Sequence, residues 1–402
     1  MTRKRSVAIA GAGPSGLTAA LFLARAGIPV TVLEREDTFF EDPRAATFHP
    51  PTLEMYEATG VTDRLHEEGI VARKWQFRDR EQGVVAEFDL GLIGGETRYP
   101  YRLQVEQHKL VRILADELTK FPDARIHMGA PVVDVTQDAD KVTVRAGKPG
   151  TEIVLECDFL IGADGGRSVV RKSQGISFDG FTWEERFIVI ATSFDFADQG
   201  FAFTCYISDP REWAALFKVP GAGPPGQWRV VFPIYGTMSE SELLQHDRAR
   251  EQLGRFTNTR DTGRISFVNL YHVHQRVAGR FRKGRVMLSG DAAHVNNPLG
   301  GMGMNFGIHD AVNLTEKLIP VINEGADDDL LDRYDRQRRH VAEAFLQTVT
   351  IQNKKMLEER DPAIRLENQT EMKRTAESPD LARAYLLRTS MIDGVRAASQ
   401  IA

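Results

Sequence analysis

The hydrophobic pattern at the start of the chain predicts a strand, a turn and a helix. Ser6–Ala10 is a short apolar run, and Gly11, Gly13 and Gly16 follow it. The stretch from about Pro14 to Arg25 has the pattern of a helix. A second apolar run, Val30–Leu33, follows and ends at Glu34. This order predicts a β-α-β unit with parallel strands and a right-handed crossover.

Apolar positions recur with two different periods in the next part of the chain. Leu110, Ile113, Leu114 and Leu118 lie at helical spacing and predict a helix over Leu103–Lys120. Shorter apolar runs predict strands, with the first two forming an antiparallel ribbon: Val132–Val135, Val142–Val144 and Phe159–Ile161.

Strand-like runs dominate between about residues 175 and 275, and we predict an antiparallel sheet that forms one wall of a site. The runs are Phe187–Ala191, Phe201–Ile207, Ala214–Val219 and Trp228–Ile234. Between the last two lies Gly221–Gly226, which is rich in glycine and proline. Because a strand follows this stretch, it is predicted as a hairpin turn and not as a phosphate loop.

The α/β pattern returns after residue 284. Val286–Leu288 predicts a strand, and Phe306–Leu318 predicts a helix. A further amphipathic helix is indicated by Leu330, Leu331, Tyr334, Arg338, Val341 and Phe345, which recur at steps of three and four. Within it, Arg336–His340 is predicted to be mostly a solvated face.

Composition narrows the class of protein. The 402 residues are 42% hydrophobic and 27% charged, which excludes a disordered, collagen-like or coiled-coil chain. A net charge of −5 lacks the basic footprint of a nucleic-acid binder. Two distant cysteines offer neither a disulfide framework nor a Cys-based zinc site, so a reducing cytoplasm is expected. The apolar run from Leu17 to Ala26 is too short to cross a bilayer, and we expect no membrane contact.

The glycines after the first strand form the motif Gly11-Ala12-Gly13-Pro14-Ser15-Gly16. Gly11 permits a tight turn, Gly13 lets a pyrophosphate approach the backbone, and Gly16 lets the helix pack on the strand. The helix N-terminus then offers N–H groups and a positive dipole to the phosphates, while Glu34 would accept both hydroxyls of a ribose. The motif predicts a bound dinucleotide; a glycine turn without a ligand is the alternative.

Two distant segments complete the pattern. Cys157–Arg171 contains an Asp-Gly pair at Asp164, and Gly284–His294 contains a Gly-Asp pair at Asp291 before the glycine-rich stretch Pro298–Asn305. With the glycine motif, in this order and at this spacing, they resemble the class A flavoprotein aromatic monooxygenases, the family of para-hydroxybenzoate hydroxylase and phenol hydroxylase. The resemblance runs from residue 5 to about residue 350 and implies FAD as the dinucleotide.

The resemblance also implies the cofactor contacts. They are Gly11, Gly13, Pro14, Ser15, Gly16, Glu34, Arg35, Arg44, Ala45, Gln107, Asp164, Asp291, Pro298, Gly301, Gly303, Met304 and Asn305. Arg44 would reach the pyrophosphate, since a guanidinium fits a diphosphate with two hydrogen bonds. Gln104 replaces Gln107 if the register differs, and Asp164 would serve both FAD and the pyridine nucleotide. At the end of its strand, Asp291 would accept from the ribityl hydroxyls, with a helix N-cap as the alternative.

The implied reaction follows from the cofactor. The stretch Gly221–Gly226 matches G-x-G-x-x-G in its letters, but a strand follows it, so the chain has no second dinucleotide fingerprint for NAD(P)H. This agrees with a family in which NADH or NADPH visits transiently to reduce FAD. Dioxygen then adds at flavin C4a, and the hydroperoxide hydroxylates a small phenolic or heteroaromatic substrate. Epoxidation or N-hydroxylation of a non-phenolic substrate stays open. A flavin-dependent halogenase would carry a W-x-W-x-I signature that this chain lacks, and the intact Pro298–Asn305 stretch disfavours a non-catalytic flavin binder.

The candidate substrate contacts follow only from where residues lie along the chain. His49 would lie near the flavin and could relay a proton or be structural. Arg229 could bind an acidic substrate or the nicotinamide cofactor, or form a surface salt bridge, and Pro298 is expected beside the flavin ring. Tyr206, Tyr235 and Tyr271 could line an aromatic pocket or merely pack in the sheet. No metal is expected, because no zinc signature stands out.

These patterns predict a mixed α/β (α+β) fold, in which a Rossmann-like FAD-binding domain is interleaved with an antiparallel-sheet substrate domain. The expected parts are residues 1–174 and 276–350 for FAD, 175–275 for the substrate, and 351–402 as a C-terminal helical segment. That last segment could cap the fold or pack on a partner subunit. Dimerisation is common in the family, so the resemblance allows a homodimer.

Overall fold

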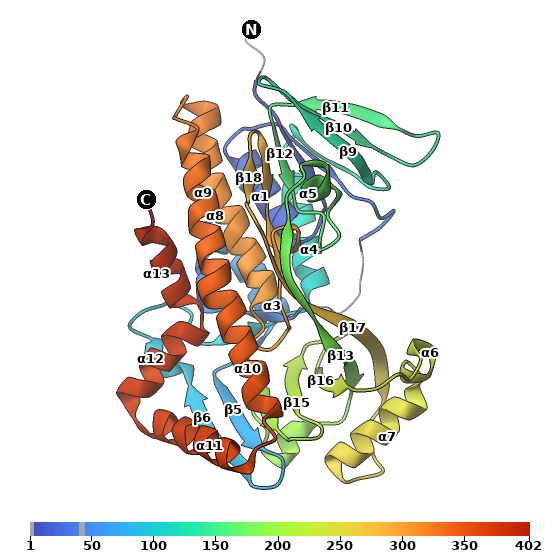
Figure 1. Cartoon of the computed structure of the whole chain (residues 1–402), viewed down its shortest axis with the longest axis vertical. Coiled ribbons are helices and arrows are strands. Elements are labelled where there is room, and N and C mark those ends of the chain that lie inside the picture. Colours follow the sequence, from blue (N-terminus) through green and yellow to red (C-terminus); the bar gives the residue numbers. More distant parts are fainter. Residues whose placement is uncertain (1–3, 40–44) are drawn as a thin grey trace.

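The computed structural model describes residues 4–39 and 45–402. Figure 1 shows an elongated molecule, with one mainly parallel sheet in its upper half and a larger mixed sheet in its lower half. Long helices run along both halves. The predicted mixed α/β fold is therefore confirmed.

A six-stranded sheet forms the upper half. Its strands are, in order, β18 (Arg282–Lys283), β19 (Val286–Leu288), β12 (Phe159–Gly162), β1 (Val7–Ala10), β2 (Val30–Leu33) and β8 (Ala124–His127). All neighbours are parallel except β18 and β19. Helix α1 (Pro14–Arg25) joins β1 to β2, which confirms the predicted β-α-β start.

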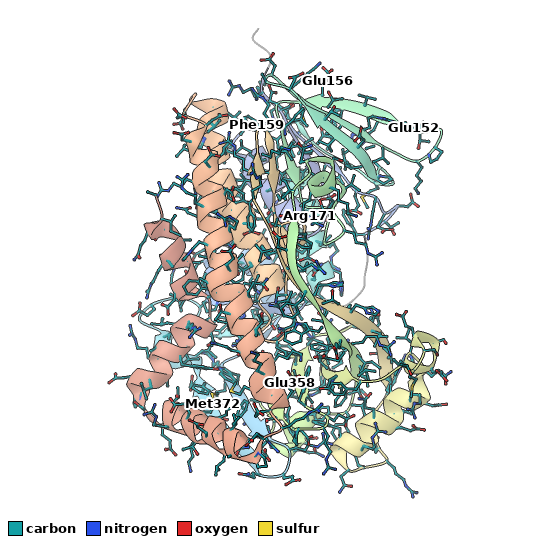
Figure 2. The ribbon with its side chains drawn as sticks, in the orientation of Figure 1. Glu152, Glu156, Phe159, Arg171, Glu358 and Met372 are labelled. Carbon is teal, nitrogen blue, oxygen red and sulfur yellow. The ribbon has the colours of Figure 1, made fainter. Side chains whose placement is uncertain are left out.

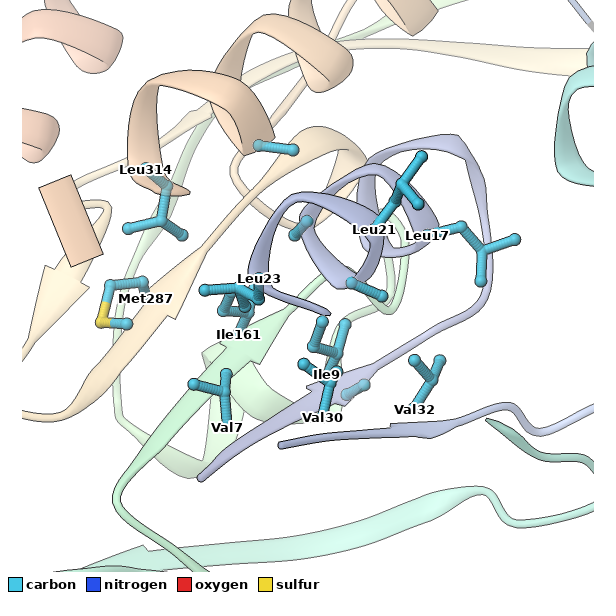
Figure 3. Packing of buried hydrophobic residues seen from close by; sticks show 14 of the residues in the cluster. Val7, Ile9, Leu17, Leu21, Leu23, Val30, Val32, Ile161, Met287 and Leu314 are labelled. Carbon is cyan, nitrogen blue, oxygen red and sulfur yellow. The ribbon is translucent and has the colours of Figure 1, made fainter. Parts of the chain in front are cut away.

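The core of this half lies between the sheet and helix α1. Figure 3 shows Leu23 of α1 beside Ile161 of the sheet, with Ile9 and Val30 on the strands below the helix. These side chains are almost wholly buried, and each contributes about 1.5–3 kcal/mol through the hydrophobic effect. Helices α4 (Gln107–Leu118) and α8 (Gly303–Asn323) pack against α1 and complete the layer.

An eight-stranded sheet forms the lower half. Its strands are, in order, β20 (His294–Val295), β17 (Ile265–Ala278), β13 (Phe178–Thr192), β16 (Gln227–Ile234), β15 (Ala214–Val219), β14 (Thr204–Ser208), β5 (Lys74–Asp79) and β6 (Gly83–Asp89). The predicted runs all contribute, although β14 begins at Thr204 and not at Phe201. Strands β15 and β16 pair antiparallel across Gly221–Gly226, so the predicted hairpin turn is confirmed.

Three parts of this half were not predicted. Strands β5 and β6 come from a much earlier part of the chain and join through β14, which runs parallel to β5. The long strand β17 was missed. Helices α6 (Glu240–Leu243) and α7 (His246–Thr257) lie between β16 and β17, and α7 buries only Ala249, Gln252 and Leu253.

Two three-stranded sheets complete the fold. One consists of β3 (Thr47–Phe48), β7 (Arg102–Gln104) and β4 (Ile70–Ala72), and the other of β9 (Val132–Gln137), β10 (Val142–Ala146) and β11 (Ile153–Cys157). The second confirms the predicted ribbon and adds strand β11; Figure 2 labels Glu156 on this strand and Glu152 just before it. The first corrects the helix predicted from Leu103: because Arg102–Gln104 pairs with both neighbours, the helix begins only at Gln107.

The C-terminal helices pack on the chain itself. Helix α9 (Asp329–Val341) continues through a π-helical turn (Ala342–Gln347) into α10 (Thr348–Glu358). Helices α11 (Pro362–Glu377), α12 (Pro379–Thr389) and α13 (Ile392–Gln400) then return against β6, the 3₁₀ turn Leu90–Ile93, and α9. Met372 in the lower part of Figure 2 belongs to this contact. The expectation that this segment caps the fold is met within one chain.

The remaining helices are short: α2 (Pro50–Glu57), α3 (Val61–Glu68), α5 (Val169–Ser173), and the 3₁₀ turns Phe196–Gln199 and Gly290–Ala292. Cys157 and Cys205 are both buried, and no disulfide joins them to each other. No helix in residues 4–39 or 45–402 combines the length and apolar character needed to span a membrane.

Candidate cofactor and substrate site

The three chemistry-bearing segments meet at one edge of the upper sheet. Strands β1, β12 and β19 are parallel neighbours, and each ends in one of the motifs. The segments are tied together by backbone hydrogen bonds, from Ala163 N to Ala10 O (2.8 Å) and from Ser289 N to Gly162 O (2.9 Å). Ligands of open parallel sheets bind at this carboxyl edge. The fold therefore joins residues that are about 280 positions apart in the sequence.

The glycine turn has the shape that a pyrophosphate requires. Gly11 adopts φ +102°, and a Cβ there would lie 2.3 Å from Ala163 O. A Cβ at Gly16 would lie 2.0 Å from Gly11 O, so this glycine is needed for packing. Gly13 instead has nothing within 4 Å of a Cβ, and it is the N-cap of α1 with Pro14 at the first helical position. Open space thus lies in front of the helix N-terminus, where an anion is favoured.

Glu34 stands at the end of β2 beside this turn. Its carboxylate accepts hydrogen bonds from Ala12 N (2.7 Å) and Glu36 N (3.0 Å), which fix its position next to the motif. Arg35 is exposed and pairs with Glu36. Arg44 lies outside the described residues.

Asp164 organises the Asp-Gly segment. Its carboxylate accepts from Ser168 Oγ (2.5 Å) and from the N–H groups of Val169 (2.7 Å) and Val170 (3.1 Å), at the start of α5. Arg171 donates to Gly166 O and to Ala292 O, both at 2.8 Å, and so joins this segment to the Gly-Asp segment. Figure 2 labels Arg171 near the middle of the molecule, between the two halves.

The Gly-Asp segment presents Asp291 at the surface. Asp291 is exposed and lies inside the 3₁₀ turn whose N-cap is Ser289, so it caps neither this turn nor α8, whose N-cap is Met302. Ser15 faces inward here: its hydroxyl contacts Ser289 Oγ (2.5 Å) and donates to Gly307 O (2.8 Å). Any contact of Ser15 with a phosphate would come from its backbone.

A buried ionic network supports this segment, and the sequence did not reveal it. Asp310 of α8 accepts from Gly290 N (3.0 Å), contacts His294 Nε2 (2.7 Å), and accepts from Arg338 Nε (2.6 Å). Burial favours a raised pKa for Asp310, but the charges of His294 and Arg338 outweigh it and hold the pKa below its ordinary value. The prediction of a solvated face at Arg336–His340 is wrong for Arg338, which is buried because it pairs with Asp310.

The glycine-rich stretch after Pro298 is held by Asn305 and His49. Asn305 Oδ1 accepts from His49 N (3.0 Å) and Thr52 Oγ1 (2.7 Å), while Nδ2 donates to Thr47 O and Gly301 O, both at 2.8 Å. With its side chain occupied in this way, Asn305 can offer a ligand only its backbone. Gly301 is also required, since a Cβ there would lie 2.8 Å from Thr47 Cβ.

His49 lies behind this stretch and is fully buried. Its Nε2 is 3.0 Å from Gly300 O. Burial, with a further effect of the Arg102 charge, lowers the pKa of His49 well below 6.5. A neutral ring whose Nε2–H donates to Gly300 O fits this environment, and it positions the backbone of the glycine stretch.

Of the two glutamines, Gln107 lies at the start of α4, where its N–H donates to Ala45 O (2.9 Å) and its side chain is half-buried. Gln104 is buried and its amide bridges Thr47 and Thr204. The side chain of Gln107 is thus the one left to face a ligand.

Arg229 is 3% exposed on β16, so it is not part of a surface salt bridge. Its Nη2 lies 4.0 Å from Glu106 Oε1, and Glu106 also accepts from Gly221 N (2.6 Å) and pairs with Lys109 (3.1 Å). Arg229 is therefore a buried neighbour of an acid at the entrance to α4.

A small apolar cavity of about 20 Å³, enough for about one water molecule, lies among the lower sheet, strand β7, the glycine stretch and helices α10 and α12. It is lined by Trp75, Phe77, Arg102, Tyr206, Gly300, Met302, Asn353, Met356, Leu357, Tyr385 and Thr389. Of the three predicted tyrosines only Tyr206 is among them, and its hydroxyl accepts from Gly300 N (3.1 Å). Tyr235 is 46% exposed and Tyr271 lies on β17; neither lines the cavity. Arg102 and Tyr385 were not predicted, because nothing in their local sequence marks them.

The residues present fit FAD. The features that FAD needs lie along one region of the molecule. They are an open helix N-terminus, a carboxylate at the end of β2, an exposed carboxylate after β19 and a glycine stretch beside an aromatic cavity. In the described residues no cluster of three His, Cys, Asp or Glu side chains could hold a metal ion.

Several known proteins are similar to this chain in sequence and in fold. The sequence model of the family described as FAD binding domain matches residues 4–349. Para-nitrophenol 4-monooxygenase of Pseudomonas sp. (strain WBC-3) is 34% identical over 393 residues, 97% of this chain and 96% of that protein. 6-Hydroxy-3-succinoylpyridine 3-monooxygenase of Pseudomonas putida is 36% identical over 343 residues, 84% and 85% of the two chains. The crystal structure of p-nitrophenol 4-monooxygenase from Pseudomonas putida superimposes with a TM-score of 0.91 at 34% identity, over 96% of this chain and 98% of that chain.

Proposed function

Because this chain belongs to the family of class A FAD-dependent aromatic monooxygenases, we propose that it hydroxylates a small phenolic or heteroaromatic ring. The reaction would consume dioxygen and a reduced nicotinamide cofactor. The observation that carries the proposal is the aromatic cavity beside Gly300 and Met302, in the stretch that resembles the flavin-binding edge of this family. The relatives named above act on a nitrophenol and on a hydroxypyridine, which supports this substrate class.

The roles of the residues follow from the geometry. The N–H groups at the start of α1 would bind the pyrophosphate, Glu34 the ribose, and Asp291 the ribityl chain. Backbone groups of Gly301–Asn305 would meet the flavin edge, since the side chain of Asn305 is already occupied. When bound, FAD supplies the hydride acceptor and the centre that activates dioxygen.

The protein's own contribution is orientation and exclusion of water. Trp75, Tyr206 and Met302 are nearly fully buried around the cavity, and His49 and Tyr206 both hold Gly300 in place. A ring enters this cavity only if these side chains move apart, and it would then be packed against the glycine stretch with little water around it. Positioning a reactant in this way is the main means by which the fold can accelerate the reaction.

The test combines spectroscopy and product analysis. The purified protein is expected to be yellow, and a panel of phenols and hydroxypyridines is expected to stimulate its oxidation of NADH or NADPH. Mass spectrometry with labelled dioxygen should then find one labelled oxygen atom in a ring hydroxyl. A labelled epoxide or N-oxide would favour the alternative reaction on a non-phenolic substrate, and a product without label would overturn the proposal.

A homodimer and a cytoplasmic location remain predictions from the sequence alone.

A further inference from the structure

Arg102 is buried in the wall of the cavity without a matching charge. It is 2% exposed, lies on β7, and its Nε and Nη1 atoms have no hydrogen-bond partner. Its guanidinium lies 5.6 Å from the ring centroid of Trp75, on the same wall. The guanidinium also has a hydrogen bond with the hydroxyl of Tyr206. It carries five donors in a fixed fork, so the open Nε and Nη1 are poised for a further acceptor that the protein does not supply.

In the described part of the chain, no carboxylate oxygen lies within 4.0 Å of a nitrogen of Arg102. Four acids on the elements around the cavity have other cationic partners: Asp79 pairs with Arg365, Glu87 with Lys74, Glu96 with Arg383 and Arg396, and Glu358 with Lys354. The two phenols in the cavity do not compensate either, because burial raises the pKa of Tyr206 and of Tyr385 and keeps both neutral.

This arrangement is unfavourable unless something else fills it. A buried charge without a partner lowers stability by several kcal/mol, and proteins tolerate it mainly where a ligand provides the partner. The rest of the lining is mainly aromatic or apolar and includes Trp75, Phe77, Tyr385, Met302 and Met356. Such walls fit the faces of a flat ring.

We propose that Arg102 binds an anionic oxygen of the substrate, a phenolate or a ring carboxylate, so that the enzyme selects aromatic anions over neutral aromatics of the same shape. The proposal rests on the proposed function for the identity of the cavity as the substrate site. The anionic group would anchor at Arg102 on β7, while the ring extends toward Gly300 and Met302, which also line the cavity. The hydroxyl of Tyr206 accepts from Gly300 N and still has its own hydrogen to donate to such a ligand.

The experiment measures binding and not turnover. The holoenzyme is titrated without NAD(P)H, by calorimetry, with 4-nitrophenolate and with 4-nitroanisole, at a pH above the pKa of the phenol. We expect wild-type protein to bind the anion at least about tenfold more tightly, since a hydrogen bond to a charged group contributes enough for a 10- to 100-fold difference. In Arg102→Met this preference should disappear while the affinity for 4-nitroanisole stays the same. Arg102→Lys should retain part of it.

Two controls separate binding from folding. Arg98→Met removes an arginine from the same segment that is 73% exposed and paired with Glu57, and it should leave both affinities unchanged. The ligand-free Arg102→Met protein should unfold at the same urea concentration as wild type or a higher one, because the substitution removes an uncompensated buried charge. A purely structural arginine would instead make that variant less stable.

Equal affinity of the wild-type holoenzyme for the two probes would overturn the proposal, and so would an Arg102→Met variant that retains the preference. The wild-type comparison decides the matter even if no Arg102 variant folds. Failure of the proposed function is a different result, seen as the absence of labelled product while the binding preference persists.

Discussion

Gly13 and Gly16 separate cofactor binding from folding within one turn. At Gly13 the backbone has φ −76°, and an added Cβ would have no neighbour within 4 Å. Gly13→Ala should therefore leave the apoprotein intact: the loss of a good N-cap residue costs about 0.5–1 kcal/mol, and the reduced freedom of the unfolded chain offsets about as much. The methyl group would, however, stand where the pyrophosphate approaches.

Gly16→Ala is the matched comparison. Its Cβ would lie 2.0 Å from Gly11 O and 3.3 Å from Ile9 Cγ2. A backbone carbonyl in a tight turn cannot move aside, so we expect a loss of about 3 kcal/mol in the free energy of unfolding, at the upper end of overpacking effects. The two alanine variants are three residues apart, but Gly13→Ala is expected to affect FAD binding and Gly16→Ala the stability of the fold.

The assay uses FAD-stripped protein for both variants. Urea denaturation reports the stability of the apoprotein, and fluorescence titration with FAD reports the dissociation constant. Gly13→Ala should weaken FAD binding by about 10- to 100-fold, since hydrogen bonds to a charged phosphate are lost, with its denaturation midpoint near wild type. Unchanged FAD affinity in Gly13→Ala would refute the placement of the pyrophosphate at this turn. Equal destabilisation of both variants would refute the steric argument.

Three further predictions concern the edge of the sheet and its support. Asp291→Ala should lower FAD occupancy, read from the flavin-to-protein absorbance ratio, with little change in apoprotein stability because Asp291 is exposed; wild-type flavin content would contradict its assigned contact. Asp310→Asn should destabilise the protein by about 3 kcal/mol or more in urea, since it leaves the buried Arg338 without its carboxylate; an unchanged midpoint would mean that the pair is not important for stability. Burial lowers the pKa of His309 from 6.5 to about 3, so the unfolded chain binds a proton that the folded chain excludes, and stability should fall as the pH drops below 6.5. His309→Gln should reduce this acid slope by up to about 1.4 kcal/mol per pH unit, measured as urea midpoints between those two pH values; an identical slope would show that His309 is protonated in the folded state.

The sequence predicted the upper half of the fold well because its signals are local. A glycine with positive φ at Gly11, a helix that begins at Pro14 and an apolar strand at Val30–Leu33 each depend on neighbours a few residues away. The lower half was predicted less completely. Strands β5 and β6 belong to its sheet only through the parallel pairing of β5 with β14, more than 120 residues later in the chain. The pattern of apolar residues within β5 or β14 does not indicate which strand each will pair with.

The candidate site divides in the same way. The sequence by itself determined the glycine turn, the acidic residues after β2 and β19 and the family to which they belong. These features are local, because each chemical group follows directly after an apolar run that predicts a strand. Only the tertiary structure decided which polar side chains are buried: Arg338 at Asp310, Asn305 among four hydrogen bonds, and Arg102 in the wall of an aromatic cavity. A pattern of apolar positions shows which face of an element is covered, but the burial of a charge depends on the partner that the fold brings to it from elsewhere in the chain.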